Sequence, residues 1–294
     1  MSRPLALACL LLATAIWGFA FIAQKTAMDV MGPLTFTGSR FLLGGLLVLP
    51  FALRENRRSP ISLTRRHWAL IAFLSVNFFM GAILQQYGLM FTTVTNSGFL
   101  TGLYVLFVPV ILLLVFREPP HRVVWLGVPM ALIGLFLLNG ARLDQLNTGD
   151  GLVIASAVFW ALHVLLVGTL VAQTRRPIFI SAISFLVAGA LGSLGAFTFE
   201  TPTLAAMSAG WIEILYAGML STAVGFTLQA IGQQHVPPAN AAIILSTESL
   251  FAALGGALIL GERLETIGYA GVVLIFAAVL LTELLPTLRR SRPA

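Results

Sequence analysis

The chain has 294 residues, of which 58% are hydrophobic and only 10% are charged, whereas soluble domains carry about 25% charged residues. This composition excludes an ordinary soluble protein and predicts an all-α integral membrane protein, because long apolar segments must satisfy their own backbone hydrogen bonds in lipid. The net charge of +6 does not indicate a nucleic-acid partner, because the basic residues lie in short segments between apolar runs.

Ten apolar segments follow one another along the chain, each bounded by Pro, Gly or charged residues. We predict membrane-spanning helices over residues 4–23, 34–53, 68–90, 98–116, 123–140, 151–171, 178–198, 211–231, 239–260 and 266–285. Each is close to the roughly 20 residues that cross a bilayer. The first resembles a secretion signal, but its apolar run is long enough to span, so we interpret it as an uncleaved helix.

Lys and Arg are distributed unevenly between the two sides of the predicted bundle. Placing the loops alternately gives 13 of the 17 basic residues to the side with both termini and 3 to the other, while Arg40 lies within the second span. Because basic loops tend to stay in the cytoplasm, we expect a multi-pass protein of the bacterial inner (plasma) membrane with both termini cytoplasmic.

The chain contains an internal repeat with an offset of 144 residues. The third to fifth spans fall on the eighth to tenth without a gap, pairing Gln85 with Gln229, Asn96 with Asn240 and Glu118 with Glu262. The first and sixth spans match at a slightly shorter offset, ATAIW at 13–17 against ASAVFW at 155–160. Because each copy has five spans, an odd number, the second copy is inverted, as in many secondary transporters. We therefore expect two inverted five-helix repeats, residues 1–143 and 144–294, with a substrate site between them.

The sequence also resembles a known family. The segment ANAAIILSTESLFAALGGALILGERLETIGYAGVVLIFAAVLL, together with Pro33 and Arg40 in GPLTFTGSRFLLGGLLVLP, is similar to the EamA-type exporters of the drug/metabolite transporter superfamily. The resemblance covers the whole chain and implies a central cavity lined by both halves and export of small metabolites. The chain departs from the family pattern in carrying Ser249 where Pro often stands, and Phe-Arg-Glu at 116–118 where the second half has Leu-Gly-Glu at 260–262.

Glu248 is the most informative candidate residue. It lies nine residues into the ninth span, about 14 Å deep at about 1.5 Å per residue. Ionisable residues at such depth are costly and usually functional, so Glu248 is a candidate for substrate binding and for proton coupling. The alternative is a neutral acid that bonds to the Ser and Thr neighbours at positions 246, 247 and 249.

Two further ionisable residues lie well inside predicted spans. Arg40 is about 9 Å into the second span, and we interpret it as a structural residue that reaches loop carbonyls or headgroups; the alternative is a clamp on a substrate carboxylate. His163 follows Trp160 by three residues and so shares its helix face. It either lines the cavity or forms a bonded interior contact.

Aromatic and amide side chains complete the predicted site. Trp17 and Trp160 occupy matching places in the two halves, where they would receive a flat or cationic ligand or simply pack. These aromatic candidates make the chain similar to the bacterial aromatic amino acid exporters. The predicted substrate-binding residues are Trp17, Asn77, Gln85, Tyr104, Trp160, His163, Gln229 and Glu248.

Glycines recur at seven-residue spacing on the third and eighth spans. Gly81 and Gly88 lie on one of these spans, and Gly225 and Gly232 lie on the other. Such positions let helices approach closely, so we assign these four glycines, with Arg40, to structure or gating.

The sequence lacks the motifs that several other functions require. The sequence has no Walker A loop, HExxH or GxSxG motif, so we expect no catalytic residue, metal site or cofactor, and an energy source other than ATP. We predict a secondary exporter, working as a monomer in the lipid bilayer on small molecules, with aromatic or hydrophobic amino acids as the leading substrates. The alternatives are export of cationic drugs or sugar conjugates, and an intramembrane lipid enzyme, which would need a second acid, a metal cluster or a nucleophile near Glu248.

Overall fold

The computed structural model describes residues 1–141, 147–263 and 265–290, and every regular element in them is a helix. The first half contains α1 (Arg3–Ala27), α2 (Pro33–Arg58), α3 (Arg65–Leu89), α4 (Val94–Gly102), α5 (Tyr104–Leu114) and α6 (Val124–Leu138). The second half contains α7 (Thr148–Thr174), α8 (Pro177–Phe199), α9 (Leu204–Ala209), α10 (Trp211–Leu215), the π-helical segment η1 (Tyr216–Phe226), α11 (Thr227–Gln233), α12 (Pro238–Leu245), α13 (Glu248–Ile259) and α14 (Thr266–Arg290). The predicted all-α class is confirmed.

Ten helical segments correspond to the ten predicted spans. Within the described residues, nine segments are long and apolar enough to cross a membrane. The tenth, α6, is a shorter apolar helix of 15 residues, so the fifth span is shorter than predicted. The fourth and ninth spans are each two helices, α4 with α5 and α12 with α13, where the sequence predicted single ones.

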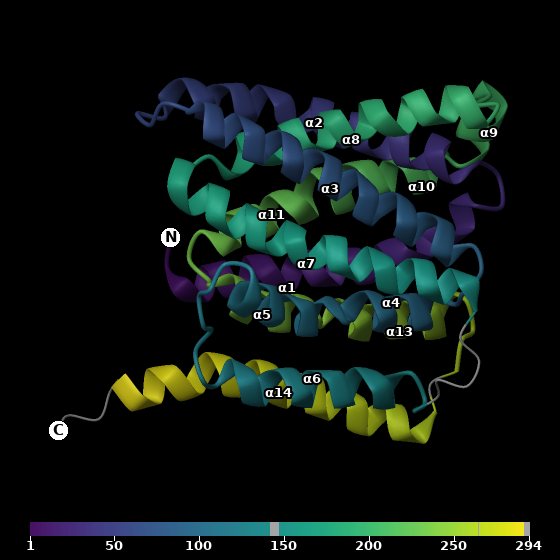
Figure 1. The fold of residues 1–294 in the computed structure, drawn as a ribbon. Helices are drawn as coiled ribbons and strands as arrows, with labels where there is room; N and C mark the ends of the chain where they lie inside the picture. Colours follow the sequence, from purple (N-terminus) through teal and green to yellow (C-terminus); the bar gives the residue numbers. More distant parts are fainter. Residues whose placement is uncertain (142–146, 264, 291–294) are drawn as a thin grey trace.

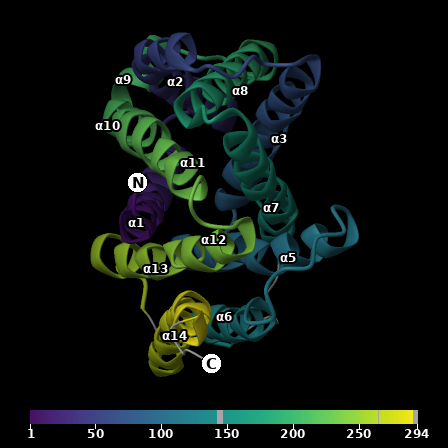
Figure 2. The ribbon, with the colours of Figure 1, turned by 90° about the vertical axis from the view of Figure 1, so that its left-hand side faces the viewer.

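The helices run side by side along one axis. The beginning of α1 and the end of α14 lie at the same end of the bundle, which we call the terminal face; the other end is the opposite face (Figure 1). Viewed along the axis, α2 packs against α8 at one edge and α6 against α14 at the other (Figure 2). The remaining long segments lie between these pairs and surround the centre. Each edge pair joins a helix of the first half to its counterpart in the second.

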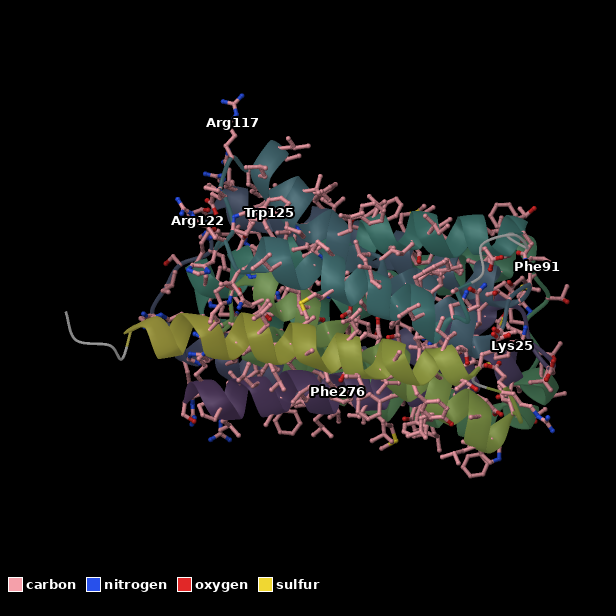
Figure 3. All side chains as sticks on the ribbon, turned by 90° about the horizontal axis from the view of Figure 1, so that it is seen from below. Lys25, Phe91, Arg117, Arg122, Trp125 and Phe276 are labelled. Atoms are coloured by element: carbon pink, nitrogen blue, oxygen red, sulfur yellow. The ribbon has the colours of Figure 1, made fainter. Side chains whose placement is uncertain are left out.

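The outer surface suits a lipid environment. Large apolar side chains on the sides of the bundle are exposed, among them Leu194, Phe197 and Val273, each at least 68% exposed. Arg117 and Arg122 lie at the terminal face and Lys25 at the opposite face, with Phe276 on the side between them (Figure 3). This distribution of apolar sides and charged ends is that of a multi-pass membrane protein.

The pair of α2 and α8 is tightly packed. A Cβ atom on Gly38 would lie 2.7 Å from the Ser193 backbone nitrogen, and one on Gly192 would lie 2.7 Å from the nitrogen of Gly38. Side chains at either position would force the helices apart, so glycine here permits the close helix approach common in membranes.

Candidate functional site

Two membrane-spanning segments are interrupted at matching positions. In the fourth span α4 ends at Gly102 and α5 begins at Tyr104, and in the ninth span α12 ends at Leu245 and α13 begins at Glu248. Tyr104 and Glu248 are separated by the repeat offset of 144 residues. Transporters built from inverted repeats commonly use such broken helices to present polar groups near the middle of the membrane.

Hydroxyl groups beside Glu248 bond to the backbone. The side chains of Ser246, Thr247 and Ser249 each donate to the carbonyl oxygen three residues earlier, at distances of 2.7–2.8 Å. These bonds supply partners to carbonyl groups at the interruption, as hydroxyls often do in membrane helices. The hydroxyls are therefore engaged with the backbone and not with the carboxylate of Glu248.

A central cavity lies next to this interruption. It is lined by residues of both halves, namely Trp17, Phe21, Gln24, Arg40, Gln85, Thr101, Tyr104, Trp160, His163, Val164, Ser221, Phe226, Gln229, Leu245 and Glu248. The empty space between them, including any opening, is about 510 Å³, which falls within the roughly 300–1,000 Å³ of small-molecule sites. Except for Phe226, which is half-buried, every lining residue is more than nine-tenths buried.

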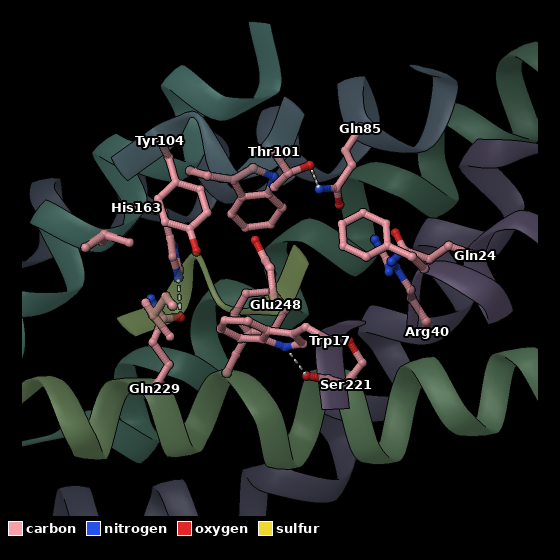
Figure 4. A pocket seen from close by; sticks show the side chains of 15 residues that line it. Trp17, Gln24, Arg40, Gln85, Thr101, Tyr104, His163, Ser221, Gln229 and Glu248 are labelled. Carbon is pink, nitrogen blue, oxygen red and sulfur yellow. Dashed lines mark hydrogen bonds between the residues drawn. The ribbon is translucent and has the colours of Figure 1, made fainter. Parts of the chain in front are cut away.

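The cavity contains one basic and one acidic side chain. Arg40 is 3% exposed and Glu248 is 5% exposed, and neither forms an ion pair with a described residue. The guanidinium carbon of Arg40 lies 4.5 Å from the ring centroid of Phe41. In the close view, Arg40 lies with Gln24 and Gln85 on one side of Glu248, while His163 and Gln229 lie on the other (Figure 4). Burying a charged group without a partner is costly, so Arg40 and Glu248 are both candidates for binding a charged ligand.

Aromatic rings form much of the cavity wall. The ring of Phe226 lies 4.5 Å from that of Trp17 and 5.7 Å from that of Trp160, the second pair being stacked at 18°. Trp17 donates its indole N–H to the Ser221 carbonyl at 3.1 Å, whereas the indole N–H of Trp160 is buried and no described residue accepts it. The wall therefore offers flat apolar surface and one free donor.

A chain of hydrogen bonds fixes the orientation of His163. The Gln233 amide donates to the Val164 carbonyl at 2.9 Å, and the Gln229 amide donates to the Gln233 side-chain oxygen at 2.9 Å. The remaining Gln229 oxygen lies 3.2 Å from His163 Nε2. Because that oxygen can only accept, Nε2 is the donor and a neutral His163 carries its lone pair at Nδ1. Nδ1 is buried without a hydrogen-bond partner.

The four predicted glycines lie at close helix contacts. A Cβ atom on Gly225 would lie 2.6 Å from Trp17 Nε1, and one on Gly81 would lie 3.4 Å from the indole of Trp160. Cβ atoms on Gly88 and Gly232 would meet backbone carbonyl oxygens at 2.6 Å and 3.0 Å. Gly225 therefore leaves the space that Trp17 occupies, whereas Gly81 meets Trp160 only at an ordinary contact distance.

The structure brings seven of the eight predicted substrate-binding residues into this one cavity. The exception is Asn77, which donates its side-chain amide to the Phe159 carbonyl at 2.8 Å and so links α3 to α7. Arg40, which the sequence favoured as structural, also lines the cavity. Gln85 donates to Thr101 at 2.9 Å. The functional roles of these residues remain predictions.

Sequence reasoning missed seven lining residues, namely Phe21, Gln24, Thr101, Val164, Ser221, Phe226 and Leu245. The internal repeat carries a signal for some of them. Thr101 and Leu245 are 144 residues apart, and Phe21 and Val164 are 143 apart, the offset that relates Trp17 to Trp160. Both members of these two pairs were missed, so candidates already predicted do not lead to them. The offset of 144 residues leads from one predicted residue, Asn77, to one missed lining residue, Ser221.

In the part of the chain that the structure describes, no three or more His, Cys, Asp or Glu residues are grouped so as to hold a metal ion. The cavity chemistry is that of hydrogen bonds, two charges and aromatic surface.

Comparison with known proteins decides the family. The profile of the EamA-like transporter family matches residues 4–140 and, a second time, residues 147–284. The chain belongs to the EamA-like transporter family. As a member of this family, it is a multi-pass membrane transporter, in agreement with the broken helices and the central cavity.

Related proteins are similar over nearly their full length. An uncharacterized transporter of Archaeoglobus fulgidus is 29% identical, covering 94% of this chain and 84% of the relative. The uncharacterized inner membrane transporter YedA of Escherichia coli is 23% identical, covering 91% of this chain and 87% of YedA. A solved crystal structure with 18% identity has a TM-score of 0.78 and covers 99% of this chain and 100% of its own. That structure shows the shared fold, while the relatives extend the transporter assignment.

Proposed function

We propose that this EamA-like transporter exports small amphipathic metabolites, foremost aromatic and other hydrophobic amino acids, by alternating access through the central cavity. The observation that carries the proposal is that Arg40 and Glu248 line one aromatic-walled cavity and that neither forms an ion pair with a described residue. A zwitterion with an apolar side chain is the simplest small molecule that satisfies both charges and the wall together.

The carboxylate of such a substrate suits Arg40. A guanidinium binds a carboxylate through two parallel hydrogen bonds, and Arg40 Nε is buried with no hydrogen-bond partner in the described part of the chain. Gln24 and Gln85 lie on the same side of the cavity (Figure 4) and offer neutral amides beside the carboxylate. This assignment favours the substrate clamp over the structural interpretation of Arg40.

The ammonium group suits Glu248. One carboxylate oxygen of Glu248 is buried without a hydrogen-bond partner among the described residues. His163 Nδ1, which also has no such partner, adds a second acceptor to the same cavity. Because an ammonium donates three hydrogen bonds, Glu248 and His163 together supply a fitting set of acceptors.

The side chain of the substrate would lie against the tryptophans. Trp17, Trp160 and Phe226 present ring faces and edges, and aromatic pairs add about 0.5–1.5 kcal/mol beyond area burial. Aromatic amino acids should therefore bind more tightly than aliphatic ones of similar size. Protonation of Glu248 would release the ammonium group, which makes this residue the candidate for proton coupling.

Reconstitution in liposomes tests the proposal. Uptake of labelled tryptophan, phenylalanine, leucine and lysine would be compared in vesicles with wild-type protein, with the Arg54→Gln variant as a surface control, and without protein. We expect saturable uptake that is fastest for the aromatic substrates and unaffected in the control variant, because Arg54 is exposed. No uptake of any amino acid, or uptake of lysine in preference to the others, would contradict the substrate assignment while leaving the family unchanged.

A further inference from the structure

An acidic residue of the second half holds the start of a helix in the first half. Glu262 Oε1 accepts from the Val94 backbone N–H at 3.0 Å, and Oε2 accepts from the Thr95 backbone N–H at 3.0 Å and from its hydroxyl at 2.5 Å. These groups are the free donors at the N-terminus of α4, where a negative charge is favourable. The contact joins the fourth and ninth spans at the opposite face of the bundle.

The local chain is shaped for this contact. Gly261 has a φ of +69° and turns the chain after α13, so that Glu262 N–H donates to the Gly256 carbonyl at 3.0 Å. A Cβ atom on Gly256 would lie 2.5 Å from Glu262 Oε2 and 3.2 Å from the Thr95 hydroxyl. Glycine at position 256 therefore leaves the space that the carboxylate occupies.

The equivalent turn exists at the terminal face. Arg117, 144 residues before Gly261, has a φ of +58°, and Glu118 N–H donates to the Leu112 carbonyl at 3.1 Å. The Glu118 side chain is exposed and forms no hydrogen bond or ion pair with a described residue. The backbone turn and the acid are thus present in both halves, but only Glu262 is engaged.

The groups that bond to Glu262 have no equivalents near Glu118 at the terminal face. By the same offset, Pro238 stands for Val94 and has no N–H, and Ala239 stands for Thr95 and has no hydroxyl. Leu112 stands for Gly256 and puts a side chain where the space would be. The contact is therefore built at one face of the fourth and ninth spans and not at the other.

The edge pair of α2 and α8 has a glutamate bonded to a helix start at both faces. Glu200 accepts from the Leu34 and Thr35 backbone N–H groups at 2.8 Å each, at the opposite face. Glu55 accepts from the Phe179 backbone N–H at 2.8 Å, at the terminal face. This pair is therefore capped at both faces, whereas the glutamate contact of the fourth and ninth spans is present at one face.

We infer that the Glu262 contact with Val94 and Thr95 is a latch that holds the opposite face closed, so that the resting transporter opens preferentially at the terminal face. The latch joins the same two spans whose interruptions present Tyr104 and Glu248 to the cavity, so parting these spans at the opposite face must break it. In an exporter whose termini are cytoplasmic, this bias leaves the empty cavity available to cytoplasmic substrate. The inference rests on the transporter fold and not on the identity of the substrate.

Sided labelling of a cavity cysteine tests the latch without any substrate. A single reporter, Leu245→Cys, is placed in a Cys9→Ser background, and its reaction with a membrane-impermeant maleimide is timed from each face in vesicles of known orientation. For Glu262→Gln we expect labelling from the opposite face to rise about tenfold, as for a loss of about 1.4 kcal/mol, and labelling from the terminal face to fall. The matched control, Glu118→Gln, should change neither rate more than about twofold, since Glu118 has no partner to lose.

Two outcomes would overturn the inference. One is unchanged sidedness in Glu262→Gln, and the other is the same change in Glu118→Gln. If Glu262→Gln fails to give a monodisperse protein, Thr95→Val replaces it, because this change removes one bond and keeps the carboxylate. For Thr95→Val we expect the rate of labelling from the opposite face to rise by about threefold. Equal labelling rates in this variant and its parent would also overturn the inference.

Discussion

Tyr104 and Glu248 occupy the same position in the two halves of the protein, each as the first residue after the break in a membrane-spanning segment. One half supplies a phenol hydroxyl and the other a carboxylate. The hydroxyl and one carboxylate oxygen are buried without a hydrogen-bond partner among the described residues. An inverted repeat brings matched positions to opposite sides of one axis. The difference between the two residues therefore makes the cavity chemically one-sided, with its acid contributed by the second half alone.

Replacing Glu248 by Gln should uncouple transport from a pH gradient. Gln keeps the shape of the side chain but can neither bind a proton in this range nor attract an ammonium group. We expect wild-type uptake of tryptophan to respond to an imposed pH gradient, and uptake by Glu248→Gln to be at least about tenfold slower, since hydrogen bonds to charged groups contribute about 1.5–3 kcal/mol. Residual uptake by the variant should not respond to the gradient; an equal response in both proteins would exclude Glu248 as the coupling group.

Replacing Arg40 by Lys should also impair transport, although the charge is kept. Lys lacks the planar pair of donors that matches a carboxylate, and its ammonium would not stack on the Phe41 ring in the same way. We expect the initial rate of tryptophan uptake at low concentration to fall about tenfold, one bidentate contact being replaced by a single one. The control Arg54→Lys lies on the surface and should keep the wild-type rate. An Arg40→Lys protein with normal uptake would return Arg40 to a purely structural role.

Replacing Gly225 by Ala should displace Trp17. The added methyl group would lie 2.6 Å from the indole nitrogen, so the ring must move and its hydrogen bond to Ser221 must lengthen or break. We expect a protein that still folds but transports aromatic substrates several-fold more slowly, measured as uptake per purified protein. Gly151→Ala is the matched control, because no atom lies within 4 Å of the added carbon; it should transport normally. Equal activity of the two variants would show that the position of Trp17 is not important.

Replacing Glu200 by Gln should lower stability without reaching the cavity. The carboxylate accepts two backbone N–H groups and the Thr35 hydroxyl, the latter at 2.6 Å. Loss of the charge at this helix start should lower the free energy of unfolding by about 1–2 kcal/mol. The apparent melting temperature in detergent is the measurement, with Glu118→Gln as control. Identical melting of Glu200→Gln and the control would show that the cap contributes little.

Much of the site could be predicted because intramembrane polar residues are expensive. Glu248, His163, Gln85 and Gln229 stand out in an apolar chain, and a buried polar group in lipid needs a partner or a function. The repeat then predicted that residues of both halves would meet near the axis. Asn77 met the same criterion but bonds to a neighbouring helix backbone, a use that composition cannot distinguish from cavity lining.

Other features left no usable signal in the sequence. Phe21 and Phe226 are two of 21 phenylalanines, and nothing local separates a cavity ring from a core or lipid-facing one. Gln24 lay one residue beyond the predicted first span, whereas α1 continues to Ala27. The breaks carry no proline that would mark them, since Leu103 stands at one and Ser246 and Thr247 stand at the other. The proline of the fourth span, Pro109, lies within α5.

Binding of three indole compounds tests the central claim most directly. Tryptophan carries both charges, tryptamine only the positive one and indole-3-propionate only the negative one. Their affinities would be measured on purified wild-type protein, Arg40→Gln and Glu248→Gln. We expect Arg40 to bind the carboxylate and Glu248 to bind the ammonium group. Arg40→Gln should then weaken the binding of tryptophan and indole-3-propionate but not of tryptamine. Glu248→Gln should weaken the binding of tryptophan and tryptamine but not of indole-3-propionate. The account would be contradicted if both variants weakened the binding of all three ligands equally, or if neither variant weakened the binding of any of them.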